Sequence, residues 1–130
     1  MISLLLLLGC PGADGDSGGD TGAEFAPTLV NVQAQVFDMS CAFSTCHGDG
    51  GGSGNLSLTV GSSFVNLVGV PADGDATQTR VIPGDPDGSY LVMKMEDATG
   101  IVGDPMPGVP LEQDRIDLVR AWIEDGAQDN

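Results

Sequence analysis

Two of the three cysteines in this 130-residue chain and its only histidine lie within seven residues, in the segment Cys41-Ala-Phe-Ser-Thr-Cys46-His47-Gly48. Thiol and imidazole groups are metal ligands, and thiols also form covalent bonds. Aromatic residues make up only 5% of the chain. A small domain with so little bulk commonly needs a disulfide, a metal or a bound group to complete its core. We therefore expect the fold to depend on what this segment holds.

The chain is strongly acidic. It has 19 Asp and Glu residues against four bases, and its formal net charge is −15. Such a balance argues against binding to nucleic acid, whose phosphates need a basic patch, and against binding to an anionic membrane through protein charge. It fits a partner protein with a basic docking face, although the acids also serve solubility in an extracellular or saline setting. We expect a monomer.

The N-terminal residues predict export. Residues 1–9 contain the apolar run Leu4 to Leu8, too short to span a bilayer, and are followed by Cys10. This segment resembles a bacterial lipoprotein signal, in which Cys10 would carry the lipid; the alternative is a buried apolar N-terminus with an ordinary cysteine. Residues 10–26 are rich in Gly and Asp and predict a flexible, disordered tether. We expect a chain anchored to a bacterial membrane by this lipid only, on its periplasmic or cell-surface side.

The folded domain is expected over residues 27–130, as short helices and long loops. Leu29, Val32, Val36 and Phe37 recur at helical spacing and predict a helix that leads to Cys41. Shorter helices are predicted over 61–68 and 89–95. A longer final helix is predicted to end at Gly126, with an apolar face formed by Ile116, Val119, Trp122 and Ile123.

The segments between these helices predict loops. Residues 48–54 are rich in glycine, and residues 97–110 contain three prolines and three glycines. Residues 55–60 alternate in polarity and predict an extended segment with Leu56, Leu58 and Val60 turned inward. No strand pairing is compelling, so the predicted class is all-α. Phe37 and Trp122 are expected to meet where the first and last helices cross.

Several phrases together resemble class I c-type cytochrome domains. They are a helix ending in Cys-x₄-Cys-His-Gly, a late Met106-Pro-Gly, and a final Arg120-Ala-Trp-Ile-Glu-Asp-Gly-Ala127. The usual haem attachment motif is C-x-x-C-H, and the longer spacing found here occurs as a variant. Three further phrases, Val36-Phe37, Gly54-Asn-Leu-Ser-Leu58 and Arg80 to Leu91, are similar to cytochrome c-like lipoproteins of myxobacteria and planctomycetes. The resemblance covers residues 30–127 and implies a cytochrome c-like fold around one covalently bound haem c.

The resemblance assigns roles to five residues of this domain. Cys41 and Cys46 would form thioethers with the haem, and His47 would be the proximal ligand of the iron. Met106 would be the distal ligand, because a thioether is a soft ligand and the adjacent prolines stiffen its loop. Arg80 is placed to pair with a haem propionate.

Alternatives remain open for these residues. Cys41 and Cys46 could instead form a disulfide, which an exported protein permits. Arg80 could form an exposed salt bridge. Met39, Met93 and Met95 compete with Met106 as ligands, and the sixth position of the iron could be open.

The function expected from these residues is electron transfer outside the cytoplasm by a lipid-anchored, single-haem carrier. No nucleophile triad, phosphate loop or paired catalytic carboxylates are visible, so we expect no substrate chemistry of its own. A haem-free surface lipoprotein module, stapled by a Cys41–Cys46 disulfide, is the alternative. A haem peroxidase or sensor is a third possibility and would need an open iron site.

Overall fold

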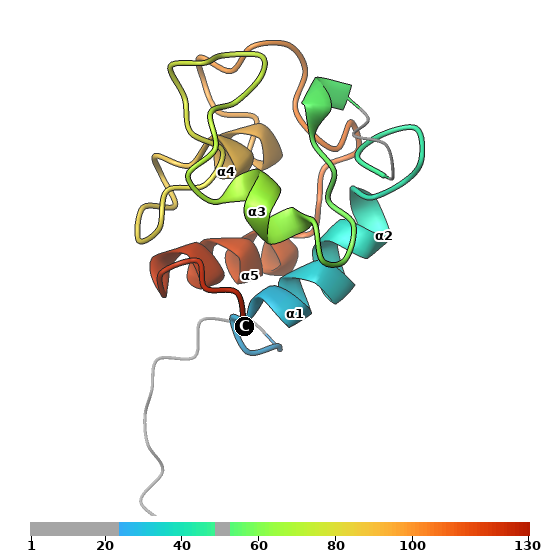
Figure 1. Cartoon of the computed structure of the whole chain (residues 1–130), viewed down its shortest axis with the longest axis vertical. Helices are drawn as coiled ribbons and strands as arrows, with labels where there is room; N and C mark the ends of the chain where they lie inside the picture. The colour runs from blue at the N-terminus through green and yellow to red at the C-terminus, as the bar shows by residue number, and fades with distance from the viewer. Residues whose placement is uncertain (1–23, 49–52) are drawn as a thin grey trace, which may run out of the picture.

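The first element of the fold is a helical segment that leads directly to Cys41. The computed structural model describes residues 24–48 and 53–130, and this segment consists of α1 (Leu29–Val32), the π-helical turn η1 (Gln33–Phe37) and α2 (Asp38–Ser40) (Figure 1). The side chain of Thr28 caps its start by accepting a hydrogen bond from the Asn31 amide at 3.3 Å. The predicted helix before the cysteines is confirmed.

The π-helical turn places a polar side chain inside the fold. Gln33 is buried and donates hydrogen bonds to the Leu58 carbonyl at 2.8 Å and to the Asp38 carboxylate at 2.6 Å. The Oε1 atom of the Gln33 side chain accepts a hydrogen bond from the Ser63 hydroxyl at 2.7 Å. One glutamine therefore joins the first helical segment to two later parts of the chain.

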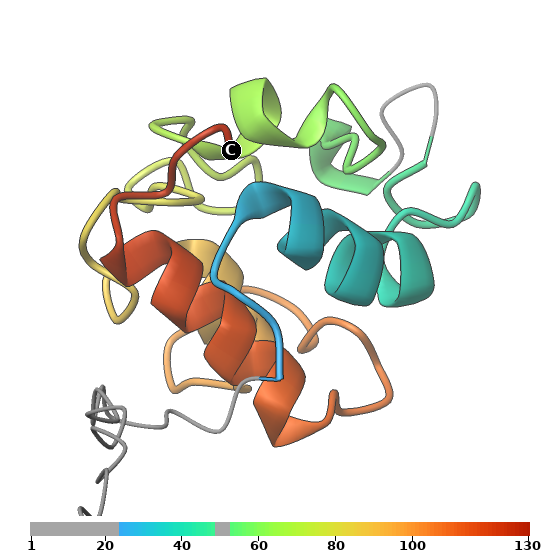
Figure 2. The same cartoon turned by 90° about the horizontal axis from the view of Figure 1, so that it is seen from below.

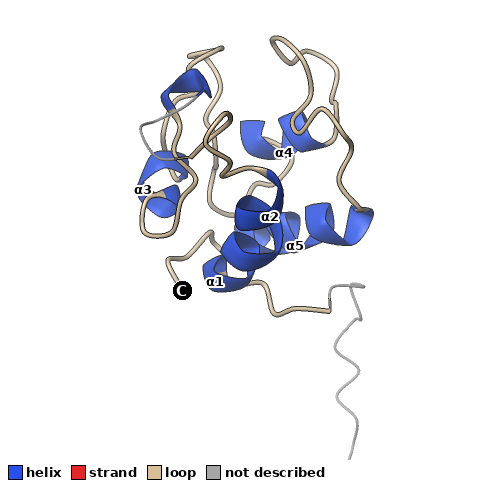
Figure 3. Ribbon diagram, turned by 90° about the vertical axis from the view of Figure 1, so that its right-hand side faces the viewer, coloured by secondary structure: helices blue, strands red, loops and turns tan. Residues whose placement is uncertain are grey.

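The remaining helices are short, apart from the last. They are the 3₁₀ turn η2 (Ser53–Asn55), α3 (Ser63–Leu67), α4 (Tyr90–Met95) and α5 (Gln113–Glu124), and long loops connect them (Figure 3). The described residues form isolated β-bridges, such as Val68 with Val81, but no sheet. The predicted all-α class with long loops is confirmed at this level.

The prediction for residues 55–60 was partly wrong. Leu58 is buried, but Leu56 is only partly buried and Val60 is 74% exposed. The segment does not pair with a neighbouring strand, so nothing maintains a strict alternation of its side chains.

Helix α5 forms the centre of the core. α1 and α4 both pack against it (Figure 2). Its buried residues are Ile116, Leu118, Val119, Trp122 and Ile123. Trp122 and Phe37 are both completely buried in the same apolar cluster, as expected from the apolar faces of the first and last helical segments.

The end of the chain folds back onto the start of α1. Gly126 has a φ of 107°, a conformation that glycine adopts without strain, and it follows the end of α5 as predicted. The Trp122 indole then donates to the Gln128 carbonyl at 2.9 Å. Asn130 accepts hydrogen bonds from the amides of Leu29 and Val30, both at 3.0 Å, and so satisfies two donors of the first helical turn.

The predicted signal segment, the lipidation site Cys10 and most of the predicted tether lie outside the described residues. Among the helices that are described, none has the length and apolar character needed to cross a membrane.

Candidate functional site

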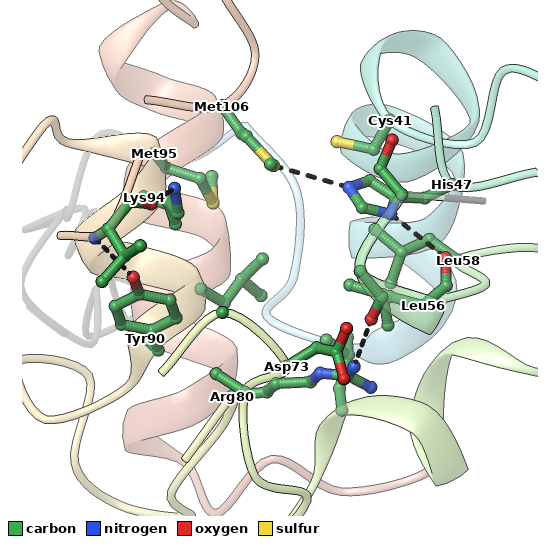
Figure 4. A pocket seen from close by; sticks show the side chains of 17 residues that line it. Cys41, His47, Leu56, Leu58, Asp73, Arg80, Tyr90, Lys94, Met95 and Met106 are labelled. Atoms are coloured by element: carbon green, nitrogen blue, oxygen red, sulfur yellow. Dashed lines mark hydrogen bonds between the residues drawn. The ribbon is translucent and has the colours of Figure 1, made fainter. Parts of the chain in front are cut away.

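A cavity lies between the segment that carries Cys41 and His47 and the opposite wall formed by α4 and the loop after it (Figure 4). Its volume is about 210 Å³, and it is partly open to solvent. Most of its lining is apolar and includes Leu56, Leu58, Leu67, Ala72, Leu91 and Met95. A cavity of this kind, with few polar groups, suits a large apolar ligand that is oriented by a small number of specific contacts.

His47 contributes a nitrogen to the cavity wall. Its side chain is only 8% exposed, and its Nδ1 lies 3.1 Å from the Leu56 carbonyl oxygen. Because a carbonyl only accepts hydrogen bonds, this contact assigns the proton of a neutral imidazole to Nδ1. Nε2 is then left with its lone pair, which is the form in which an imidazole binds a metal.

The turn that carries His47 is closely packed. The His47 amide donates to the Cys41 carbonyl at 3.1 Å, and the Leu58 amide donates to the His47 carbonyl at 2.8 Å. A Cβ added at Gly48 would lie 2.9 Å from both the Phe43 carbonyl oxygen and the Ser44 Cα. The glycine after His47 therefore allows the backbone to close this turn.

Met106 faces His47 from the opposite wall. Its Sδ lies 3.5 Å from His47 Nε2, although the side chain as a whole is 41% exposed (Figure 4). With Nδ1 protonated, both facing atoms are lone-pair donors, so neither supplies a hydrogen for a bond between them. These two atoms are therefore a nitrogen and a sulfur that face each other at the wall of an apolar cavity, and both could act as ligands of one metal.

The competing methionines are placed differently. Met39 is exposed, and its sulfur lies 4.0 Å from the Arg115 guanidinium. Met95 is buried and lines the cavity as part of its apolar wall, while Met93 is not among the lining residues. The sulfur that contacts His47 is that of Met106.

Four hydrogen bonds hold the Met106 loop against α4. The Met106 amide donates to the Lys94 carbonyl at 2.9 Å, and the Val102 amide donates to the Tyr90 hydroxyl at 2.8 Å. The Lys94 ammonium also donates to the carbonyls of Val102 and Asp104. Tyr90 and Lys94 lie in the helix predicted over residues 89–95, but no sequence pattern indicated a role for them at the site.

The two cysteines of the motif differ in their surroundings. Both are free thiols in the structure, and the alternative disulfide between them is not present. Cys41 is partly buried and lines the cavity, whereas Cys46 is exposed and is not among the lining residues. Burial, together with the neighbouring Cys46, raises the pKa of the Cys41 thiol from 9.0 to about 11. Cys41 is therefore protonated at neutral pH.

Arg80 contributes a buried positive charge to the cavity lining. Its side chain is 9% exposed and donates to the backbone carbonyls of Gly54 and Asn66, both at 2.8 Å. Burial lowers the pKa of Arg80, and the charge of nearby Asp73 opposes this effect. The ion pairs within the described residues belong to Arg120, so the open alternative of an exposed salt bridge at Arg80 does not match its burial.

Cys41, His47, Met106 and Arg80 thus line one cavity, although up to 65 residues separate them in the sequence. The described residues contain no cluster of three or more His, Cys, Asp or Glu side chains that could hold a bare metal ion. This chain finds no match among known family models, curated proteins or solved structures.

Proposed function

We propose that residues 27–130 form a c-type cytochrome domain that holds one haem and carries electrons outside the cytoplasm. The observation that carries the proposal is the approach of His47 Nε2 and Met106 Sδ to 3.5 Å across an apolar cavity. Ligation by an imidazole and a thioether raises the reduction potential of haem iron, so a haem held by His47 and Met106 would supply a one-electron couple.

His47 Nε2 and Met106 Sδ would hold the iron of a haem bound in this cavity. At 3.5 Å the two atoms are in contact, so a metal held by both requires them to move apart. Met106 lies on a loop and is partly exposed, whereas His47 is buried and bonded on both sides. We expect the loop to make this adjustment.

The polar groups of the cavity suit an apolar ligand with acidic groups at one edge. Arg80 is buried, donates to two carbonyls and has no carboxylate at ion-pair distance within the described residues. A guanidinium has five N–H donors, so it retains donors for an anion. Haem propionates are such anions, and this charge-assisted pairing is the proposed role of Arg80.

Cys41 and Cys46 are the proposed covalent anchors. Each thiol would add its S–H across a vinyl group of the haem to form a thioether, so no oxidant is needed. The position of Cys41 on the cavity wall supports this role. Cys46 follows in the same short turn and immediately precedes His47, so both anchors and the proximal ligand belong to one segment.

We further propose export and a lipid anchor at Cys10, on the basis of the N-terminal sequence alone. The partners would be redox proteins with a basic docking face. All four basic side chains are engaged within the fold. Arg80 bonds to backbone carbonyls, Lys94 to the Met106 loop, Arg115 to Gln35 and Arg120 to two acids. The charge presented to a partner is therefore predominantly negative.

The deciding experiment is a haem stain after denaturing electrophoresis, combined with a pyridine haemochrome spectrum. The protein should be expressed in cells that carry a haem c maturation system. We expect haem that survives denaturation in the wild type and is lost in the variant with Cys41→Ala and Cys46→Ala. The variant Met39→Ala, which changes an exposed methionine outside the cavity, is the control and should retain its haem.

A colourless protein without free thiols at Cys41 and Cys46 would overturn the proposal. That result would favour the haem-free, disulfide-stapled lipoprotein module. A haem-loaded protein whose spectrum does not respond to Met106→Ala would instead favour an open iron site, and with it a peroxidase or sensor.

A further inference from the structure

The contacts of Lys94 are concentrated on one short stretch of the loop that carries Met106. Its ammonium donates to the carbonyls of Val102 and Asp104, the second at 2.8 Å, and its own backbone carbonyl accepts from the Met106 amide at 2.9 Å. The side chain and the main chain of one residue therefore bind both flanks of the segment 102–106. Lys94 also lines the cavity itself.

The charge of Lys94 is directed to this loop and not to an acid. The ion pairs among the described residues do not include Lys94, and its ammonium lies 5.9 Å from the centre of the Tyr90 ring. Hydrogen bonds from an ammonium are stronger than those between neutral groups. Tyr90, one helical turn earlier, accepts from the Val102 amide, so α4 holds the loop at two neighbouring points.

We propose that Lys94 is a positioning residue for Met106, which keeps the loop 102–106 against α4 so that the sulfur points at His47 Nε2. The geometry supports this role. Met106 is partly exposed and lies outside any helix, so neither core packing nor helical hydrogen bonds fix its position. In part, the inference rests on the proposed function: the orientation of the sulfur matters chemically only if iron binds between Met106 and His47.

The test compares Lys94→Leu with the wild type. Leucine keeps a similar apolar stem but has no donor and no ligand atom. Amide hydrogen exchange at Val102 and Met106, measured on the protein as purified, reports how often the loop opens. We expect exchange to become about tenfold faster, which corresponds to a loss of about 1.4 kcal/mol. The control is Arg120→Leu, which removes the same charge from an ion pair on the surface and should leave both amides unchanged.

A second readout uses the haem-loaded protein. Added imidazole competes with Met106 for the iron, so a loosened loop should raise the apparent affinity for imidazole by about tenfold in Lys94→Leu. The same substitution in a Met106→Ala background should have no further effect, because the ligand that Lys94 positions is absent.

The results separate the two proposals. Unchanged exchange in Lys94→Leu, or an equal rise in imidazole affinity in both backgrounds, would overturn the role of Lys94. A protein without haem would overturn the proposed function, while the exchange measurement would still decide whether Lys94 holds the loop. If the leucine variant does not fold, Lys94→Gln tests the charge alone, because it retains an N–H donor; exchange at both amides should again be faster than in the wild type, and unchanged exchange would overturn the role of Lys94.

Discussion

The hydrogen bond from His47 to the Leu56 carbonyl determines which nitrogen of the imidazole faces the cavity. The sequence predicted His47 and Met106 as a pair from the family resemblance, and the structure brings both side chains to one cavity. Leu56 could not be predicted from the sequence as the partner of Nδ1. Every residue has a backbone carbonyl, and only the fold decides which carbonyl lies close to His47. For the same reason, the hydrogen bonds from Lys94 to the carbonyls of Val102 and Asp104 could not be predicted.

Replacement of Met106, the proposed distal ligand, should change the redox properties of the haem-loaded protein. Met106→Ala removes the thioether, and we expect the reduction potential to fall by on the order of 100 mV, within the ~0.8 V range that axial ligands control. Voltammetry together with the absorption spectrum would measure the change. Met39→Ala is the matched control, since Met39 is exposed outside the cavity, and it should leave the potential unchanged. Equal potentials in all three proteins would contradict ligation by Met106.

Gly48 should be intolerant of a side chain. In Gly48→Ala the new Cβ would lie 2.9 Å from two backbone atoms, at Phe43 and Ser44, which cannot move aside as a flexible side chain could. We expect a loss of about 1–3 kcal/mol in the free energy of unfolding, the usual cost of overpacking. Urea denaturation would measure it. Gly108→Ala places a Cβ with no atom within 4 Å, at an ordinary φ, and should change stability by less than about 0.5 kcal/mol.

The Cys41 thiol should make the stability of the haem-free protein depend on alkaline pH. Its pKa is raised from 9.0 to about 11 in the folded state, so the thiol stays protonated there while the unfolded chain loses the proton. The unfolded state then binds fewer protons, and stability falls as pH rises from 9 to 11, by about 2–3 kcal/mol at 1.36 kcal/mol per pKa unit. Below pH 9 this thiol causes no change.

Denaturant titrations at several pH values would test this dependence. Cys41→Ala should remove the fall between pH 9 and 11, whereas Cys46→Ser should retain most of it, because burial is the main cause of the raised pKa. A thioether at Cys41 would also remove the fall in stability between pH 9 and 11, since the sulfur then has no proton to lose. A fall that persists in Cys41→Ala would assign the titration to another group.

Among the elements, the first helical segment depends on a polar residue for its attachment to the rest of the fold. Gln33→Met would leave the Leu58 carbonyl and the Ser63 hydroxyl without their partner in a buried position. At about 1–3 kcal/mol for each such group, we expect a loss of about 2–5 kcal/mol in the free energy of unfolding. Thermal or urea unfolding would measure it. Gln113→Met, on the exposed face of α5, should cost less than about 0.5 kcal/mol, and equal losses in the two variants would refute the role of Gln33.

The helices could be predicted from the sequence because each has an apolar face, as in the buried residues of α5. The π-helical turn could not be predicted, because the contacts of Gln33 with distant residues accompany it and local periodicity does not record such contacts. The prediction for 55–60 relied on alternation, which is a reliable guide only where a strand pairs with a neighbour. This segment is unpaired, and Val60 is exposed.

At the scale of the whole molecule, 19 Asp and Glu residues against four bases give the chain a formal net charge of −15. We expect electron exchange between the haem-loaded protein and a cationic redox protein to slow by roughly tenfold between low and high salt, because ions screen the attraction. Stopped-flow kinetics would measure the rate. Exchange with an anionic redox protein should show the opposite salt dependence, and two identical dependences would contradict steering by charge.

The contact between Asn130 and the first turn of α1 brings the last residue of the chain close to the start of the first helix. Cys41 and the cavity lie at the other end of that helical segment, which is roughly 18 Å long at 1.5 Å per residue. Anything joined to the domain at residue 24 or residue 130 therefore attaches at the end away from the cavity wall. A surface probe or electrode coupled through either terminus would hold the domain by the end that lies away from Cys41.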